Sequence, residues 1–215
     1  MAGYTSGVGI IDIAPGLWIW RARHPFWQEG DDWPEIVTST FVSAGKERYV
    51  IDALVPTLDN IGLWERLDSA PPTSILVTMP DHVRDVDLFS RRYKARPMGP
   101  LLFFPEDVPK IKLDPILPGM ELAGGLVPLY DGRGRMETPI WIPEHRTIVF
   151  GDALTERKGK LLVWYSYAHN ERELPALRAM LRLPFERVII SHCDNHPVLG
   201  RSDFEKALEL PPYKF

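Results

Sequence analysis

Cysteine is almost absent from the sequence, because Cys193 is the single cysteine among 215 residues. One cysteine excludes an intramolecular disulfide and also a zinc site built from several thiolates of one chain. The sequence lacks an apolar run of membrane-spanning length, and residues 1–13 lack the basic and apolar segments of a signal peptide. These absences predict a cytoplasmic protein that does not bind a membrane.

An excess of positive charge is absent too. The chain has 25 Lys and Arg residues against 29 Asp and Glu residues, for a net charge of −4, and the basic residues form no block. Nucleic acids and anionic membranes bind to clusters of basic residues. We therefore predict a small-molecule substrate and no nucleic-acid partner, and the sequence gives no indication of the oligomeric state.

Apolar residues and prolines, in contrast, are plentiful. Hydrophobic residues make up 45% of the chain, which is enough for a packed core, and the 21 prolines indicate many loops and short strands. The length suits one sizeable domain or two small ones. We expect a single domain over residues 1–215.

Apolar runs and alternating patterns divide the chain into short elements. Helices are expected at 60–68 and 86–93 and in segments that begin near residues 170 and 202. Strands are expected at 9–13, 17–21, 36–44, 48–54, 75–77, 101–104, 126–130, 138–142, 147–150, 161–165 and 187–191.

The chain is organised around the segment from the strand at 75–77 to the helix at 86–93. Asp81 and His82 lie on the loop between these two elements, the kind of loop where open α/β sheets place their chemistry. A carboxylate and an imidazole are both good ligands for a divalent metal ion. In the alternative interpretation, Asp81 lies near the start of the helix and His82 is a surface residue.

Two further polar groups follow predicted strands. Asp152 comes after the strand at 147–150, and His192 comes directly after the strand at 187–191. Each has an ordinary interpretation, since Gly-Asp often forms a turn and a histidine at a strand end is often a satisfied polar residue. Because Asp81 and His82 occupy the same kind of position, the coincidence predicts one shared site.

At this point the order of features resembles the metallo-β-lactamase fold superfamily. The matching segments are IDALVP at 51–56, LVTMPDH at 76–82, WIPEHRTIVFGDAL at 141–154 and LPALRAMLRLPFERVIISHCDNHPV at 174–198. They are similar to the family's early strand, its Thr-His-x-His-x-Asp-His signature, its hairpin ending in Gly-Asp and its closing helix, strand and histidine. The resemblance implies an α+β fold, a four-layer αβ/βα sandwich.

The signature itself departs from the family pattern. Where the family has Thr-His-x-His-x-Asp-His, this sequence has TMPDH at 78–82. With a gap of two residues, Asp81 and His82 align with the closing Asp-His pair. Without the gap, Val83 and Arg84 align there and almost no metal ligand remains. We use the gapped alignment.

The resemblance then implies a half-site. Asp81, His82, Asp152 and His192 match the ligands of the family's second metal site, whereas Arg133 falls where the third histidine of the first site would be. The expected cofactor is one divalent metal ion, zinc first and manganese or iron as alternatives, or none. Arg133 would supply positive charge and bind an anionic oxygen, unless it points to solvent.

The function implied by this half-site is that of a hydrolase with a single metal ion. It would act on an ester, thioester or phosphoester, with water on the metal as the nucleophile and Asp81 and Arg133 among the catalytic residues. Four protein ligands would close a tetrahedral zinc shell, so Asp152 would move away or a metal with a larger shell would bind. The alternative is a non-catalytic, metal-free protein of the same fold that binds a small molecule or a protein.

The remaining candidates have ordinary interpretations. Cys193 is expected to be a buried, inert thiol, because the sequence shows no basic partner for it. The aromatic loop with Phe26, Trp27 and Trp33 either lines the mouth of a site or packs as a flap. Four histidines are expected not to be ligands: His24, His145, His169 and His196.

Overall fold

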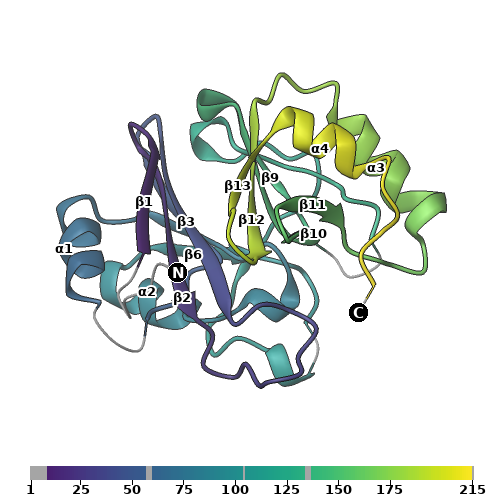
Figure 1. Cartoon of the computed structure of the whole chain (residues 1–215). Coiled ribbons are helices and arrows are strands. Elements are labelled where there is room, and N and C mark those ends of the chain that lie inside the picture. Colours follow the sequence, from purple (N-terminus) through teal and green to yellow (C-terminus); the bar gives the residue numbers. More distant parts are fainter. Residues whose placement is uncertain (1–8, 57–59, 104, 134–136, 215) are drawn as a thin grey trace.

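The structure is a computed structural model that describes residues 9–56, 60–103, 105–133 and 137–214 (Figure 1). The strands are β1 (Gly9–Ala14), β2 (Leu17–Arg23), β3 (Ile36–Ala44), β4 (Glu47–Ile51), β5 (Ser74–Leu76), β6 (Arg96–Gly99), β7 (Asp114–Pro115), β8 (Val127–Pro128), β9 (Ile140–Ile142), β10 (Thr147–Arg157), β11 (Lys160–Val163), β12 (Arg187–Cys193) and β13 (Val198–Gly200). The α-helices are α1 (Ile61–Ser69), α2 (Val86–Tyr93), α3 (Leu174–Met180) and α4 (Arg201–Ala207). Single turns of other helix types are η1 (Pro80–His82), η2 (Pro105–Asp107), η3 (Ala123–Gly125), η4 (Pro143–His145) and η5 (His169–Glu173).

The strands form two halves that meet along β3 and β12. The first half has the order β7-β6-β5-β4-β3, with β2 and β1 continuing from β3, and the second has the order β12-β10-β9-β8, with β13 on β12 and β11 on β10. In the described residues β3 and β12 share one register pair, Val37 with His192. The curled sheet is therefore continuous, and its two halves are joined at His192.

Alternation along the strands gives each half two apolar faces. In β2, Trp18 and Trp20 pack with the core under α1 and α2, whereas Leu17 and Ile19 pack into an inner core shared by both halves. In Figure 1, α1 and α2 lie on the outside of the first half and α3 and α4 on the outside of the second.

The second half repeats this arrangement. Ile148 and Phe150 of β10 pack with the core that includes Phe204 of α4, whereas Val149 packs into the inner core together with Ile189 of β12. The molecule therefore has four layers: helices, the first half of the sheet, the second half of the sheet, and helices. One apolar core lies between each pair of neighbouring layers. The α+β sandwich predicted from the sequence is confirmed.

One predicted strand is wrong. Residues 101–103 form no strand, and Leu101 and Leu102 are 59% and 62% exposed; residue 104 lies outside the described residues. The strand at this place is β6, which contains Pro97 and Gly99 and pairs with β5 and β7. A Cβ atom at Gly99 would lie 2.8 Å from a methyl of Leu113 and 3.0 Å from Cβ of Val77, so a larger residue there would force its neighbours to move. Proline and glycine both hide a strand from a pattern search.

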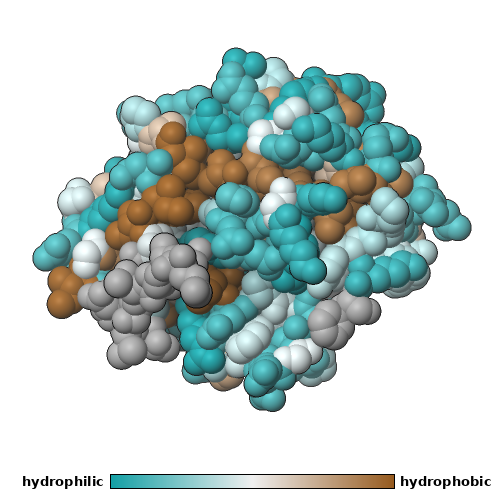
Figure 2. Space-filling model, in the orientation of Figure 1, coloured by the Kyte–Doolittle hydropathy of each residue, from teal (hydrophilic) through white to brown (hydrophobic). Residues whose placement is uncertain are grey.

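Hydrophobic residues also reach the surface. On the face shown in Figure 2 they form a band across the molecule. Ile13, Ala14 and Val198 are only partly buried against the inner core, so that core is not fully covered. No helix in the described ranges is both long enough and apolar enough to cross a membrane.

Candidate active site

The first site residue comes from the turn between β5 and α2. Pro80 begins this turn, η1, where its missing N–H costs nothing. The turn places His82 inside the protein, with a side chain that is 5% exposed, and leaves Asp81 exposed. The loop position predicted for both residues from the sequence is confirmed.

The second and third residues come from neighbouring strands. β10 and β12 run parallel on both sides of a bulge, in which residues 151–154 stand opposite the single residue Ser191. Asp152 lies in this bulge, and His192 is the last but one residue of β12. Both were expected just beyond their strands. That detail is wrong, because the bulge lets β10 pair again and continue to Arg157.

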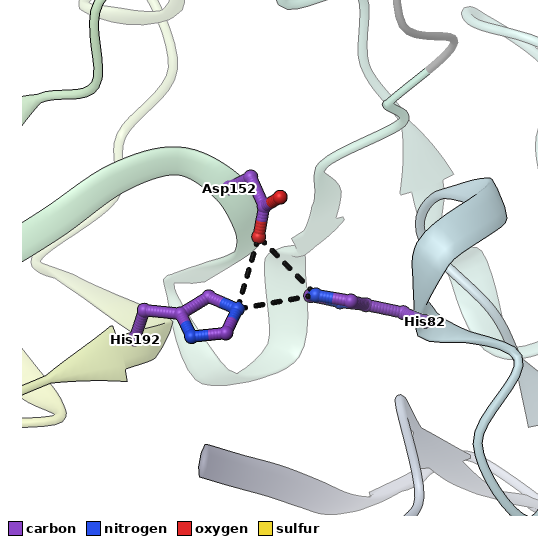
Figure 3. A group of neighbouring side chains, drawn as sticks. All are labelled: His82, Asp152 and His192. Atoms are coloured by element: carbon purple, nitrogen blue, oxygen red, sulfur yellow. Dashed lines mark hydrogen bonds and ion pairs between the residues drawn. The ribbon is translucent and has the colours of Figure 1, made fainter. Parts of the chain in front are cut away.

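These elements bring His82, Asp152 and His192 together (Figure 3). The Nε2 atoms of His82 and His192 lie 3.2 and 3.1 Å from Oδ1 of Asp152 and 3.3 Å from one another. Zinc bonds of 2.0–2.1 Å in a tetrahedron separate neighbouring ligands by about 3.3–3.4 Å. The triangle therefore has nearly the size of one face of a tetrahedral zinc site.

The structure does not bring Asp81 into this group. Asp81 and His82 are consecutive in a tight turn, so their side chains diverge, and only His82 is buried. Asp81 instead lines the cavity in front of the three residues. Three protein ligands rather than four leave one tetrahedral position open, which is the arrangement of catalytic zinc sites.

Asp52 orients His82 from behind. Its backbone is left-handed, with φ of 50°, and Oδ2 lies 2.8 Å from Nδ1 of His82. Thr78 donates to the same carboxylate from its backbone N–H at 2.8 Å and from its hydroxyl at 2.6 Å. The carboxylate therefore fixes the imidazole so that Nε2 faces Asp152 and His192. From the sequence, Asp52 was only a position inside the predicted strand at 48–54.

The charges of the group follow from burial and from these contacts. Burial and the Arg84 guanidinium lower the pKa of His82. The carboxylates of Asp52 and Asp152 outweigh both and raise it to about 9. Burial raises the pKa of Asp152, but the two imidazoles outweigh it and hold that pKa well below the usual value. Burial lowers the pKa of His192. A protonated His82 therefore offsets part of the negative charge of Asp52 and Asp152.

The contact between Asp52 and His82 gives a testable prediction. We expect Asp52→Asn to weaken zinc binding by about 10–100-fold, because outer-shell partners of metal-binding histidines have effects of that size. Asparagine also tolerates a left-handed backbone, so the turn is retained. Zinc affinity would be measured by competition with a chromophoric chelator. Asp12→Asn, at the exposed contact with Arg66, is the control; equal affinity in both variants would contradict a role for Asp52.

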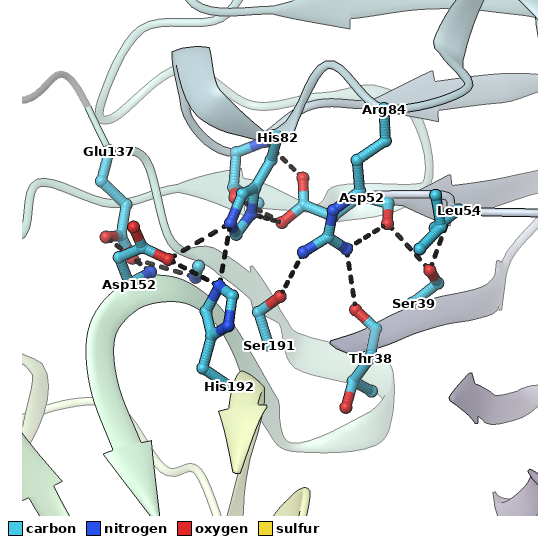
Figure 4. A network of polar contacts seen from close by, with 12 residues as sticks. Thr38, Ser39, Asp52, Leu54, His82, Arg84, Glu137, Asp152, Ser191 and His192 are labelled. Atoms are coloured by element: carbon cyan, nitrogen blue, oxygen red, sulfur yellow. Dashed lines mark hydrogen bonds and ion pairs between the residues drawn. The ribbon is translucent and has the colours of Figure 1, made fainter. Parts of the chain in front are cut away.

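Arg84 lies beneath the site and joins the two halves (Figure 4). One guanidinium nitrogen donates to the backbone oxygens of Asp52 at 2.7 Å and Thr38 at 3.1 Å. The other donates to the hydroxyl of Ser191 at 2.7 Å. These bonds engage both terminal nitrogens of the guanidinium, so Arg84 is a positively charged residue with a structural role in the floor of the cavity. Sequence reasoning missed it, because its partners are distant along the chain.

Glu137 supports the bulge that carries Asp152. Its carboxylate accepts from the backbone N–H of Gly151 at 3.0 Å and of Asp152 at 2.9 Å (Figure 4). A Cβ atom at Gly151 would lie 2.8 Å from the Thr78 hydroxyl and 3.1 Å from the Met79 sulfur. Glycine is therefore required at the start of the bulge, and Glu137 fixes the backbone that follows.

Arg133 belongs to this supporting network and not to the cavity. The residue is 5% exposed, so the alternative in which it points to solvent is wrong. Its guanidinium lies 3.3 Å from Glu137 and 3.4 Å from Glu173. It is not among the residues that line the cavity. Two buried carboxylates therefore hold Arg133, and it contacts the candidate site through Glu137.

A third buried acid of this network gives a pH-dependent prediction. Burial, with Glu137 adding to it, raises the pKa of Asp131 to about 9. The folded protein therefore holds a proton that the unfolded chain releases near pH 4, and stability falls as pH rises between these values. Between pH 6 and 8 we expect the free energy of unfolding of wild type to decrease with pH more steeply than that of the Asp131→Asn variant. The difference is up to about 1.4 kcal/mol per pH unit, measured by urea unfolding. Identical pH dependence in both proteins would contradict this protonation.

The group opens into a cavity of about 280 Å³. Trp33 and Trp164 stand edge-on to the imidazole of His192, with ring centroids 5.6 and 5.9 Å away. The aromatic loop therefore lines the mouth of the site through Trp33. The lining residues are His24, Asp32, Trp33, Asp81, His82, Arg84, Asp152, Trp164 and His192.

The other candidates are placed as follows. Cys193 is fully buried, as predicted, and burial raises the pKa of its thiol to about 11. His145 contacts the backbone oxygen of Ser43, and His169 contacts Glu173. Among the described residues, the group able to hold a metal ion includes none of His24, His145, His169 and His196.

Comparison with known proteins places the fold but no closer relative. No family model matches the chain, and no curated protein matches it. Solved structures match over almost the whole length. The metallo-β-lactamase from Pontibacter korlensis is 16% identical, with a TM-score of 0.69 over 95% of this chain and 100% of that one.

Two other structures agree with this match. FIM-1 from Pseudomonas aeruginosa, in its mono-zinc form, is 16% identical, with a TM-score of 0.68 over 94% of this chain and 95% of that one. The metallo-β-lactamase from Hirschia baltica is 14% identical, with a TM-score of 0.66 over 97% of this chain and 100% of that one. The chain has the metallo-β-lactamase fold, as its sequence predicted.

Proposed function

We propose that the protein is a metal-dependent hydrolase that holds one divalent metal ion at His82, Asp152 and His192. The substrate would be an ester, thioester or phosphoester. The observation that carries the proposal is the triangle of ligand atoms, 3.1–3.3 Å on each side, whose open side faces the cavity. The mono-zinc form of FIM-1 supports it, because a protein with this fold holds a single zinc ion.

The donor atoms suit zinc, and also manganese or iron(II). Two imidazole nitrogens and one carboxylate oxygen are a common donor set of catalytic zinc. When bound, a divalent ion supplies a Lewis acid that polarises a carbonyl or phosphoryl oxygen and makes water acidic enough to react near neutral pH.

The protein's own residues would do the rest of the work. Asp52 holds the His82 ring, and Glu137 holds the backbone of Asp152, so both ligands are oriented before anything binds. Trp33 and Trp164 pack edge-on against the His192 ring and hold its orientation. Asp81, on the cavity wall, is the carboxylate we assign to proton exchange with the substrate.

The test combines metal content with hydrolysis. Untagged protein would be loaded with zinc, manganese or iron(II), desalted and assayed by elemental mass spectrometry. Para-nitrophenyl butyrate, S-butyrylthiocholine and para-nitrophenyl phosphate would be the substrates. We expect about one equivalent of metal and hydrolysis of at least one substrate that chelation abolishes.

Two results would count against the proposal. Protein that holds no metal after reconstitution would rule out the single-metal mechanism. Metal-loaded protein that hydrolyses no substrate of the three classes would show that the site is not a hydrolase site of the proposed kind. Protein stripped of metal and then reloaded is the control for damage during chelation.

A further inference from the structure

A second cavity adjoins the one in front of the candidate metal ligands. Its volume is about 460 Å³, and it shares His24, Asp81 and Arg84 with the first cavity. Part of its wall is apolar and includes Phe26, which is 80% exposed, and Val108. A substrate larger than the first cavity would continue into the second past the three shared residues.

The imidazole of His24 stands at this junction with one ring nitrogen unpaired. Its Nδ1 atom is buried and has no hydrogen-bond partner in the described part of the chain. Arg84, which is also shared, already donates to backbone oxygens and to Ser191. Buried polar atoms without a partner are rare in folded proteins. Nε of Arg84 is also without a partner in the described residues. His24 is thus the uncharged one of the three shared side chains, with a ring nitrogen that can hydrogen-bond to a ligand.

The His24 ring is nevertheless held in place. It stands edge-on to Trp33, with ring centroids 4.9 Å apart, and packs against Phe26 at 5.9 Å. Its backbone N–H donates to Glu35 at 2.9 Å. Because Trp33 also stands edge-on to His192, the aromatic loop fixes His24 relative to the candidate ligands. Burial lowers the pKa of His24 to about 4, so the neutral ring offers one donor and one acceptor near pH 7.

The charges along the second cavity restrict what it can accept. Four carboxylates line it, those of Asp81, Asp85, Asp87 and Glu106, against two cations, Arg84 and Lys110. Asp87 is paired with Arg91 on the surface. The other three carboxylates still outnumber the two cations, so an anionic group would be repelled, whereas an uncharged group would contact the apolar wall.

We propose that a substrate spans both cavities, with its ester or thioester group beside the candidate ligands and its uncharged acyl group in the second cavity. The carbonyl oxygen of that group accepts a hydrogen bond from His24 where the cavities meet. This rests on the proposed hydrolase function and narrows it. Uncharged carboxylic esters or thioesters fit this arrangement, and substrates with an anionic acyl group do not.

Two variants of His24 separate hydrogen bonding from packing. Glutamine retains a donor and an acceptor but not the aromatic packing, whereas phenylalanine retains the packing and removes both polar atoms. With para-nitrophenyl butyrate and zinc-loaded protein, we expect kcat/KM to fall by about 10-fold or more in His24→Phe and less in His24→Gln, since a lost substrate hydrogen bond has an effect of this order. The reverse order would show that His24 only packs and would overturn the proposal. His196→Gln, at an exposed histidine outside both cavities, is the matched control.

The charge of the acyl group is tested with a matched pair of esters. Para-nitrophenyl butyrate and the para-nitrophenyl half-ester of glutarate have the same leaving group, but only the second carries a carboxylate at the end of the acyl chain. We expect kcat/KM to be at least about 10-fold higher for the butyrate, a preference that decreases with added salt. Equal rates would overturn the assignment of an uncharged acyl group.

A binding measurement distinguishes this inference from the proposed function. Benzohydroxamate combines a metal-chelating group with an apolar ring, and its affinity for zinc-loaded protein can be measured by calorimetry without turnover. We expect His24→Phe to bind it at least about 5-fold more weakly than wild type, with unchanged zinc content. If wild type hydrolyses nothing yet this difference is found, the hydrolase proposal fails and the role of His24 stands. Equal affinities would overturn the role of His24 whatever the activity.

Discussion

Replacing His192 with alanine is expected to abolish stoichiometric zinc binding. The loss should exceed about 100-fold in affinity, beyond the range typical of outer-shell residues, because two remaining ligands leave the ion held by His82 and Asp152 alone. Hydrolysis should be lost in parallel. Elemental mass spectrometry after desalting and a chelator competition would measure the effect.

The variants that control this prediction are available in the chain. His82→Ala should behave like His192→Ala, since both imidazoles contribute an Nε2 atom to the same triangle. His196→Ala removes an exposed histidine outside the group and should bind zinc like wild type. Full zinc occupancy in His192→Ala would show that the ion binds elsewhere and would remove the basis of the proposed function.

Replacing Arg133 with methionine is expected to destabilise the protein by about 3–5 kcal/mol, the usual effect of removing one partner of a buried ion pair. The side chain of Arg133 is 3% exposed, and those of Glu137 and Glu173 are fully buried. Burial already raises the pKa of Glu137 to about 7, against the pull of Arg133. Without the arginine, two buried carboxylates would lose their counter-charge. Urea unfolding at pH 8 would measure the change.

Two comparisons isolate the cause of that loss. Arg91→Met makes the same substitution at the exposed pair with Asp87 and should cost no more than about 1 kcal/mol. The double variant Arg133→Met with Glu137→Gln should recover part of the stability, because one uncompensated charge is then removed. A loss at Arg133 as small as that at Arg91 would contradict the importance of the buried network.

Much of the fold was predictable from the sequence, because alternation reports which face of a strand is buried. The pattern of Trp18 and Trp20 against Ile19 indicated a strand with two different faces, and the structure assigns these faces to two cores. The strand β6 was not predictable in this way. Proline and glycine, which β6 contains at Pro97 and Gly99, are not typical of strands, and Gly99 is explained only by its neighbours Val77 and Leu113.

The candidate site was predictable in part. His82, Asp152 and His192 could be found because each follows or ends an apolar strand, a position that sequence patterns reveal. Asp81 was grouped with them because it precedes His82, although a tight turn separates the directions of the two side chains.

The supporting residues could not be found by such rules. Asp52 and Arg84 act through contacts with residues about 30 to 107 positions away, and Glu137 supports Asp152 through backbone bonds that any residue type can donate. The position of His24 depends on the aromatic loop around it. Their roles depend on three-dimensional contacts, which a single sequence does not report.

The proposed metal site also has a consequence for the stability of the folded protein. His82 belongs to the first half of the molecule, whereas Asp152 and His192 belong to the second. His192 lies 110 positions further along the chain than His82. An ion can contact all three only when the halves are docked, so binding draws on the folded population alone. Free metal at 100 times its dissociation constant then adds about 2.7 kcal/mol to stability by mass action. Through the proposed site, metal supply would therefore change the folded fraction of the protein as well as its activity.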